Sequence, residues 1–382
     1  MNLKELKTLQ LVSVRWWNAS AYYAISLAEA LNKSAYKSIV AGREDSPPLQ
    51  RACEYGLPIF TGINLESTSP RKAIRNILSL KKILAAEQIA LINAHRPEDH
   101  FFGALINKLS SQKIPLVRTV SDVRPPKDHR LNRWLHDAGT DFYIFSCKAS
   151  FERYQSVWPI FEDRSAIIYS AIDTDRFRPF DKPSPLRRKF GIDDTEVVVG
   201  IVARLDPVKD HRTFLKAARI VSQKVPGVRF LISGESCNIS HSQLRQFAEE
   251  LGIADKTIFH ERDDALNIRE LLGCLDVGIV ASNGSEVICR VAVEYMALGI
   301  PQVTTNINVL PEIIENGENG FAVNAGDAEA MADRILYLIQ NSFVRKEMGE
   351  KARRYAETRF SYNTFVKQTV AVYEDTIEKL EI

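Results

Sequence analysis

The sequence has 382 residues, of which 45% are hydrophobic and 26% are charged. These proportions are typical of a globular protein and exclude a largely disordered chain. Its apolar runs are far shorter than the roughly 20 residues that a membrane helix needs, and charges stand where a signal peptide would have its apolar core. At about 150 residues per domain, the length predicts two or three domains, and we expect a cytoplasmic location.

Apolar runs that predict strands alternate with stretches of helical spacing along the whole chain. The first predicted strands are residues 9–14, 38–41, 91–94, 116–120 and 142–146, with a helix over 22–31. Further strands are predicted at 197–203, 229–233, 257–260, 277–280 and 302–304, and helices at 213–223, 244–252, 268–274 and 291–298. This alternation is typical of parallel sheets with crossover helices. We therefore expect two doubly wound Rossmann-like domains.

A segment with three prolines and no apolar periodicity, residues 174–186, separates the two series of elements. It predicts a first domain over residues 1–178 and a second over residues 179–360. The remaining residues, 361–382, predict an amphipathic C-terminal helix.

The net charge of +2 is unevenly distributed along the chain. Residues 1–182 carry 26 Lys and Arg against 19 Asp and Glu, whereas residues 183–382 carry 24 against 29. The basic first part favours an anionic partner there, either a phosphorylated acceptor or a lipid surface. A solvated charged face is the alternative.

The five cysteines are widely spaced and form no CxxC pair. Neither a disulfide framework nor a zinc site is expected. Each cysteine is predicted to be a small buried residue.

The first candidate site follows the predicted strand at 197–203. Arg204 ends this strand, and Pro207 suits the first turn of a helix beginning near Asp206. An arginine, Lys209 and free helix N–H groups then meet at the carboxyl end of a sheet strand. Such a corner favours anion binding, although two surface cations after a strand remain the simpler interpretation.

The second candidate site contains two glutamates, Glu286 and Glu294, near the start of a predicted helix. If both were helical, eight residues would separate them by about 12 Å on one side of the helix. That spacing suits two ends of an elongated ligand. Glu294 lies in an apolar stretch, so it needs a hydrogen-bonding partner.

Together these segments resemble the retaining glycosyltransferases of family 4, which have the GT-B type of fold and include glycogen synthase, sucrose synthase and lipopolysaccharide-core transferases. The resemblance spans most of the chain and is strongest over residues 166–322. Five segments carry it in the family's order: 167–179, 199–209, 231–235, 275–294 and 311–321. It implies two Rossmann-like domains facing across a cleft, with the C-terminal helix crossing back to the first. The first domain would be the acceptor side and the second would bind the nucleotide-sugar.

The resemblance also implies roles for individual residues. Arg204 and Lys209 match the pair that binds the donor diphosphate. Glu286 matches the glutamate beside the donor sugar, and Glu294 the one that hydrogen-bonds the ribose. The remaining expected donor contacts are Gly234, Ser285 and Val287.

The first domain departs from the family in the loop after its first strand, which contains no glycine. Close backbone approach to the donor is therefore in doubt. His95 follows another strand, as in the family, and joins Arg204, Lys209 and Glu286 as a catalytic candidate, with a structural histidine as the alternative. The expected acceptor-side residues are Trp16, Trp17, Asn18, Ser121 and Arg124.

Two features of the first domain each have a functional interpretation and a purely structural one. Trp16 and Trp17 either stack on an acceptor sugar or pack beneath the first helix. A basic group either faces an anionic acceptor or is a solvated face; its members are Arg118, Arg124, Lys127, Arg130 and Arg133.

Asp173 and Asp175 form a DxD pattern, which binds metal in a different glycosyltransferase fold. Here the pattern lies in the linker segment, so we expect no metal and no cofactor. In the implied mechanism, protein cations and a helix dipole neutralise the leaving diphosphate. A donor phosphate oxygen takes the acceptor proton.

The expected function is a retaining transfer of a sugar from a nucleotide-sugar to a glycan or lipid-linked acceptor, in cell-surface polysaccharide or lipopolysaccharide synthesis. A sugar-nucleotide epimerase and a non-catalytic nucleotide-sugar-binding protein are the alternatives. No nucleic-acid partner is expected. Peripheral contact with the inner face of the membrane is compatible with the basic first part.

Overall fold

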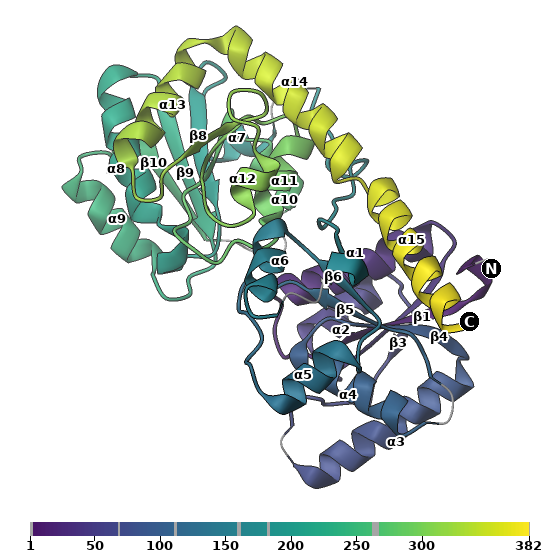
Figure 1. Ribbon diagram of the computed structural model, residues 1–382. Helices are drawn as coiled ribbons and strands as arrows, with labels where there is room; N and C mark the ends of the chain where they lie inside the picture. Colours follow the sequence, from purple (N-terminus) through teal and green to yellow (C-terminus); the bar gives the residue numbers. More distant parts are fainter. Residues whose placement is uncertain are drawn as a thin grey trace. The chain divides into compact units, whose positions relative to one another are not determined.

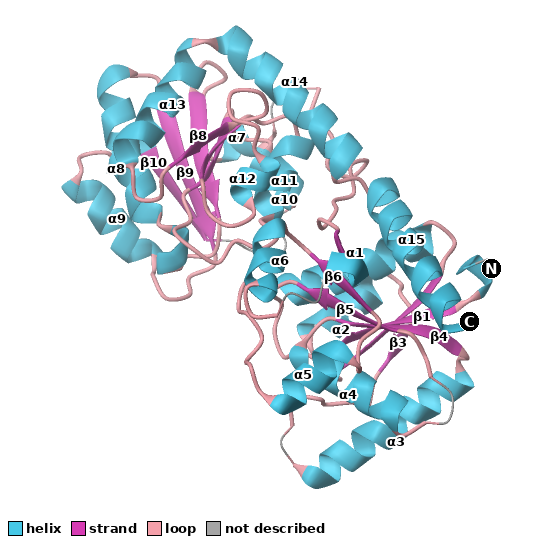
Figure 2. Cartoon of the chain, viewed as in Figure 1, coloured by secondary structure: helices cyan, strands magenta, loops and turns pink. Residues whose placement is uncertain are grey.

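The structure is a computed structural model that describes residues 3–67, 69–110, 113–158, 162–181, 184–261 and 267–381. The chain divides into two compact units. The first combines Met1–Ala171 with Tyr362–Ile382, and the second is Ile172–Ser361. Each contains a parallel sheet covered by helices, as the ribbon in Figure 1 and the colouring in Figure 2 show.

The first unit contains a seven-stranded parallel sheet in the order β3-β2-β1-β4-β5-β6-β7. Its strands are β1 (Lys7–Val12), β2 (Lys37–Gly42), β3 (Ile59–Phe60), β4 (Ile89–Ala94), β5 (Leu116–Val120), β6 (Phe142–Phe145) and β7 (Ser165–Ile167). Its helices are α1 (Ala19–Lys33), α2 (Pro47–Glu54), α3 (Pro70–Ala86), α4 (Pro97–Lys108), α5 (Arg130–Asp137), α6 (Lys148–Gln155) and α15 (Tyr362–Glu381). The strand order runs outwards in both directions from β1 and β4, as in a doubly wound sheet.

Helices cover both faces of this sheet because its strands are apolar on both sides. Helices α1 and α2 pack on one face through a cluster that includes Val12 and Leu49. Helices α3, α4 and α5 pack on the other through a cluster that includes Leu80 and Phe102.

The C-terminal helix α15 packs on the first unit, as the resemblance implied (Figure 1). The buried hydroxyl of Tyr373 accepts hydrogen bonds from Asn93 Nδ2 at 2.8 Å and from Gln10 Nε2 at 3.3 Å. Phe365 packs edge-on against Tyr23 of α1. The helix is therefore anchored to β1, β4 and α1.

The second unit contains a six-stranded parallel sheet in the order β10-β9-β8-β11-β12-β13. Its strands are β8 (Val197–Val202), β9 (Val228–Gly234), β10 (Thr257–Glu261), β11 (Val277–Val280), β12 (Gln302–Thr305) and β13 (Phe321–Val323). Its helices are α7 (Leu186–Lys189), α8 (His211–Lys224), α9 (His241–Glu250), α10 (Ile268–Leu272), α11 (Arg290–Ala297), α12 (Leu310–Ile313), α13 (Ala328–Gln340) and α14 (Ser342–Arg359).

The predicted architecture of two doubly wound parallel sheets is confirmed. Each predicted strand is present, with its ends within two residues of the prediction. The prediction of buried cysteines is wrong for Cys53 and Cys237, which are exposed, whereas the other three are buried. No helix in the part of the chain that the structure describes is long and apolar enough to cross a membrane.

Buried histidines make the stability of the first unit depend on pH. His100 and His136 are buried in contact with each other. Burial, followed by the charge of Arg118, lowers the pKa of His136 to about 3. Burial also lowers the pKa of His100 well below its usual value. Both side chains therefore remain neutral in the folded protein at pH values where the unfolded chain binds protons.

We expect the free energy of unfolding to contain a term that is lost as the pH falls below about 6.5. Substituting His136→Phe keeps a ring against Tyr143 and Trp158 and removes one such group. Between pH 7 and pH 5, the variant should lose about 2 kcal/mol less stability than the wild type in chemical denaturation. Equal losses in the two proteins would contradict the assignment.

Candidate active site

The candidate residues of the second unit lie at the carboxyl ends of β8 and β11, which are neighbours in the sheet. Strand β9 lies on one side of β8, and β11 lies on the other side. The direction in which the strands follow one another therefore reverses between β8 and β11. Open parallel sheets bind ligands at such a switch point. Arg204 and Lys209 follow β8, and Glu286 follows β11.

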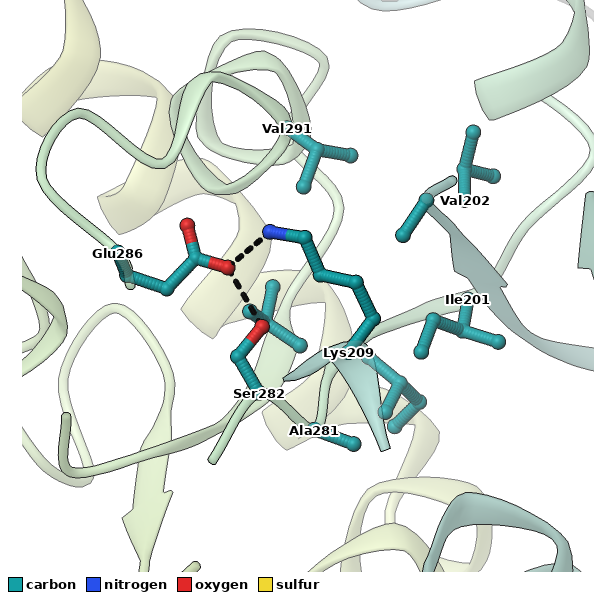
Figure 3. Close-up of a pocket in the computed structure, with 10 residues that line it drawn as sticks. Ile201, Val202, Lys209, Ala281, Ser282, Glu286 and Val291 are labelled. Atoms are coloured by element: carbon teal, nitrogen blue, oxygen red, sulfur yellow. Dashed lines mark hydrogen bonds and ion pairs between the residues drawn. The ribbon is translucent and has the colours of Figure 1, made fainter. Parts of the chain in front are cut away.

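Lys209 and Glu286, which are 77 positions apart in the sequence, meet at this edge of the sheet. The Lys209 ammonium donates to Glu286 Oε1, and the Ser282 hydroxyl donates to the same oxygen at 2.5 Å, as Figure 3 shows. Only 5% of the Glu286 side chain is exposed, against 24% for Lys209. A buried carboxylate requires such partners. The pair borders a small pocket with Val291 among its lining residues.

The electrostatics of this pair keep Lys209 charged. Burial opposes the ammonium, but the adjacent Glu286 carboxylate outweighs this effect, and the pKa of Lys209 is raised. Burial, followed by the Glu286 charge, raises the pKa of the Cys289 thiol well above its usual value. The site therefore contains an ammonium, a carboxylate and a neutral thiol.

The backbone that carries Lys209 differs from the prediction. Residues Pro207–Lys209 form a 3-10 turn instead of the start of a helix, and Asp206 caps it by accepting from Val208 N at 3.1 Å. Helix α8 begins only at His211, because Asp210 is left-handed with φ of 48° and caps the new helix through Thr213 N. This break turns Lys209 towards Glu286.

Arg204 lies near the pair on the solvent side, with 54% of its side chain exposed. Its Nη2 is 3.3 Å from Asp206 Oδ2, and Asn238 Nδ2 donates to the same oxygen at 2.8 Å. Arg204 is thus oriented by Asp206 while its guanidinium stays accessible.

The loop between β11 and α11 contains Glu286 and is folded tightly. Ser285 and Cys289 have φ values of 60° and 42°. Backbone bonds tie the loop to its surroundings, from Asn283 N to Val208 O at 3.0 Å and from Val309 N to Glu286 O at 3.2 Å. Helix α11 then starts at Arg290 without a side-chain cap.

This loop overturns the helical spacing expected for the two glutamates. Glu286 lies before α11, so only Glu294 is helical. Glu294 is buried and has the partner that the sequence required, since Arg290 Nε is 3.0 Å from its Oε1.

The other predicted donor residues are Gly234, Ser285 and Val287. A side chain at Gly234 would place a Cβ 1.9 Å from the Ala203 carbonyl oxygen, so the close approach of β9 to the end of β8 requires glycine. Ser285 is exposed, whereas Val287 is buried. Their roles in donor binding remain predictions.

Most candidate site residues of the first unit are buried or already form hydrogen bonds within the protein. His95 is 1% exposed, its Nε2 is 3.0 Å from Gln10 Oε1, and its Nδ1 has no partner among the described residues. Burial, then Arg118, lowers its pKa to about 3. Ser121 is also buried, with no partner for its hydroxyl in the described ranges. Asn18 caps α1 by accepting from Ala21 N at 3.0 Å.

The two tryptophans differ. Trp16 is 53% exposed, so the packing alternative is wrong for it. Trp17 packs against the cluster beneath α1 and edge-on against Tyr22, which agrees with that alternative.

The predicted basic group is not one free surface. Arg118 is buried and donates to the carbonyls of Ala94 and Thr119. Arg124 pairs with Asp122 at 2.5 Å, and Arg133 pairs with Asp128 at 2.7 Å. Lys127 and Arg130 are exposed. The interpretation is therefore corrected for Arg118, whose side chain lies in the core. For the four exposed members it stays a prediction, and two of these are paired with carboxylates.

Asp173 belongs to a backbone turn. Its Oδ1 accepts from Asp175 N at 3.1 Å and from Arg176 N at 2.9 Å. Within the described ranges, no group of three His, Cys, Asp or Glu side chains could hold a metal ion.

Two residues of the site were not singled out from the sequence. Ser282 directly orients Glu286, and Cys289 forms the left-handed start of α11 beside it. Ser282 had a recognisable signal, because a hydroxyl just after a buried strand and four residues before a glutamate can reach that carboxylate. Cys289 had none, because its backbone conformation has no local sequence marker.

Known families match the chain over both units. Residues 184–355 match Glycosyl transferases group 1, and residues 20–176 match Glycosyltransferase Family 4. EpsD of Bacillus subtilis (strain 168), which its name places among the glycosyltransferases, is 31% identical over 320 residues, covering 78% of this chain and 81% of EpsD. The N-acetyl-alpha-D-glucosaminyl L-malate synthase of Bacillus anthracis is 27% identical over 212 residues, covering 55% of this chain. That alignment spans about half of the synthase, 53%.

Solved structures share the fold at low sequence identity. The glycosyltransferase from Rickettsia africae ESF-5 has a TM-score of 0.87 and 18% identity, covering 97% of this chain and 98% of that one. Anabaena HepE in complex with UDP has a TM-score of 0.83 and 21% identity, covering 97% and 100%. The lipopolysaccharide outer core galactosyltransferase WaaB has a TM-score of 0.73 and 12% identity, covering 97% and 99%. The fold is GT-B, and the chain belongs to glycosyltransferase family 4, whose members are retaining enzymes.

Proposed function

We propose that this glycosyltransferase moves a sugar from a nucleotide-sugar donor to a glycan or lipid-linked acceptor in the synthesis of a cell-surface polysaccharide or lipopolysaccharide. The observation that carries the proposal is the Lys209–Glu286–Ser282 cluster at the switch point of the second sheet. The complex of HepE with UDP and the name of WaaB support the donor and acceptor classes.

In this proposal, Lys209 and Arg204 bind the donor diphosphate. The Lys209 ammonium is paired with Glu286, and an arriving diphosphate offers it a second anionic partner. Arg204, oriented by Asp206, supplies an accessible guanidinium, and the amides at the start of α11 have no side-chain cap. A helix N-terminus of this kind stabilises negative charge.

The cations act when the bond between the sugar and the phosphate breaks. Negative charge then grows on the leaving diphosphate, and preorganised cations in a site shielded from water stabilise it more than water would. Glu286 is proposed to accept hydrogen bonds from the donor sugar's hydroxyls once Lys209 turns to the phosphate. Glu294, oriented by Arg290, is proposed to contact the ribose.

The direct test is incubation with labelled UDP-, GDP- and ADP-sugars. The proposal predicts transfer to an added glycan or lipid-linked acceptor, or slow donor hydrolysis without one. Isomerisation of the donor would instead indicate an epimerase, and binding without turnover would indicate a nucleotide-sugar-binding protein.

The substitution Arg204→Ala should lower turnover by about 10²–10³-fold, as expected for the loss of one preorganised donor at a developing charge. Because the side chain is half exposed, the free energy of unfolding should change by about 0.5 kcal/mol or less. The matched control is Lys216→Ala, an exposed cation on α8, which should leave turnover unchanged. Equal turnover in the Arg204 variant and the control would remove Arg204 from the diphosphate site.

Activity should survive chelation with EDTA, because the proposed site stabilises the diphosphate with cations of the protein. The measurement compares turnover before and after dialysis against the chelator. Complete loss of activity, restored by Mn²⁺ or Mg²⁺, would contradict the proposed mechanism and favour a metal-bound donor.

A further inference from the structure

Helix α3 lies on the outside of the first unit (Figure 1), and it carries exposed apolar side chains. Ile74 and Leu78 are 61% and 63% exposed, and they lie four residues apart on one stripe of the helix. Leu109, at the end of α4, is 53% exposed. The Lys81 ammonium donates to the Leu109 carbonyl at 3.0 Å, which places Leu109 beside α3. Two large apolar side chains are therefore exposed one turn apart on α3, and Leu109 is exposed near the C-terminal half of the same helix.

All charged side chains of helix α3 are basic. Its sequence contains five Lys and Arg residues and no Asp or Glu. Arg71, Arg75 and Lys82 lie at helical spacing on a stripe next to Ile74 and Leu78, and all three are exposed. Within the described part of the chain they form no ion pair. No carboxylate among the described residues therefore neutralises their charge.

The opposite face of α3 fixes this surface in place. Leu80 and Ile83 are buried in the core beneath the sheet. Asn76 donates to the Asn64 carbonyl at 2.8 Å and accepts from Asn64 N at 2.9 Å. The outer stripes therefore belong to a firmly packed helix and are not the result of fraying.

We propose that this surface, named the α3 surface and formed by Ile74, Leu78, Leu109 and the basic residues of α3, docks the protein on an anionic lipid bilayer. Basic side chains bind anionic headgroups, while neighbouring apolar side chains enter the boundary with the acyl chains. A second copy of this chain is a poor occupant, because a symmetric contact would bring two uniformly basic helices together.

The proposal goes beyond the transfer reaction and deepens it, because a docked enzyme meets a lipid-linked acceptor where that acceptor lies. It does not depend on the proposed donor site. Vesicle binding is measured without a nucleotide-sugar, so failure of one proposal is distinguishable from failure of the other.

The test is co-flotation of the full chain with vesicles of phosphatidylcholine alone and of phosphatidylcholine mixed with phosphatidylglycerol. Wild-type protein should float with the anionic vesicles only, and less so at high salt, because exposed charges are screened. One basic residue near such a surface contributes roughly fivefold in binding. Arg71→Glu with Arg75→Glu should therefore weaken binding by at least about 25-fold.

The apolar stripe is tested with Ile74→Ser and Leu78→Ser together, which should weaken binding by roughly tenfold or more. The matched controls lie in the second unit. Lys216→Glu with Arg219→Glu makes the same charge change on exposed residues of α8, and Phe343→Ser removes a side chain that is 78% exposed. Both controls should bind as the wild type does, and all variants should keep the wild-type circular dichroism and donor turnover.

Three results would overturn the proposal. These are no flotation of the wild type with anionic vesicles, equal flotation with both compositions, and equal losses in the α3 variants and the controls. If light scattering showed a dimer that the α3 variants dissociate, without any flotation, the surface would belong to a second copy of the chain.

Discussion

The candidate site of the second unit depends on one buried carboxylate, that of Glu286. Glu286 is buried, and a buried charge is costly unless a cation and hydrogen-bond donors accompany it. One partner, Lys209, comes from the segment after β8, 77 positions away in the sequence, whereas the other, Ser282, lies in the same loop after β11. Lys209 and Glu286 lie close together because β8 and β11 are neighbours in the sheet, and the left-handed Asp210 ends the 3-10 turn that carries Lys209. The strand order and one local break in the backbone thus position the Lys209 ammonium, which we propose binds the diphosphate.

Much of the architecture was accessible from the sequence because it depends on patterns that repeat. Buried strands such as Val277–Val280 are continuous apolar runs, and parallel strands require crossover helices. The strands β3, β7 and β13 could not be predicted, since two or three residues are too few for a recognisable pattern. The start of α8 was mispredicted because Pro207 suits a 3-10 turn as well as a helix.

For the site, the sequence indicated which residue types to expect but not which of them meet. A glutamate in an apolar stretch had to find a partner, and Glu294 has one in Arg290. The Lys209–Glu286 pair could not be derived, because it depends on the tertiary pairing of β8 with β11. In the first unit the sequence pattern did not indicate the surroundings of the basic residues: Arg118 lies in the core, and Arg124 pairs with Asp122. The basic stripe on α3 was overlooked, because its significance depends on the exposed Ile74 and Leu78 beside it.

The central claim is that Lys209 binds the phosphate of the donor that lies next to the sugar. Calorimetry can measure this as the difference in binding free energy between a nucleoside diphosphate and its monophosphate, with the uridine, guanosine and adenosine pairs tested in turn. For the base that binds, the wild type should prefer the diphosphate. In the variant with Lys209→Met and Glu286→Gln, which avoids an unpaired buried carboxylate, this preference should shrink by about 1.5–3 kcal/mol, the value of a charged hydrogen bond. The same preference in both proteins would contradict the account.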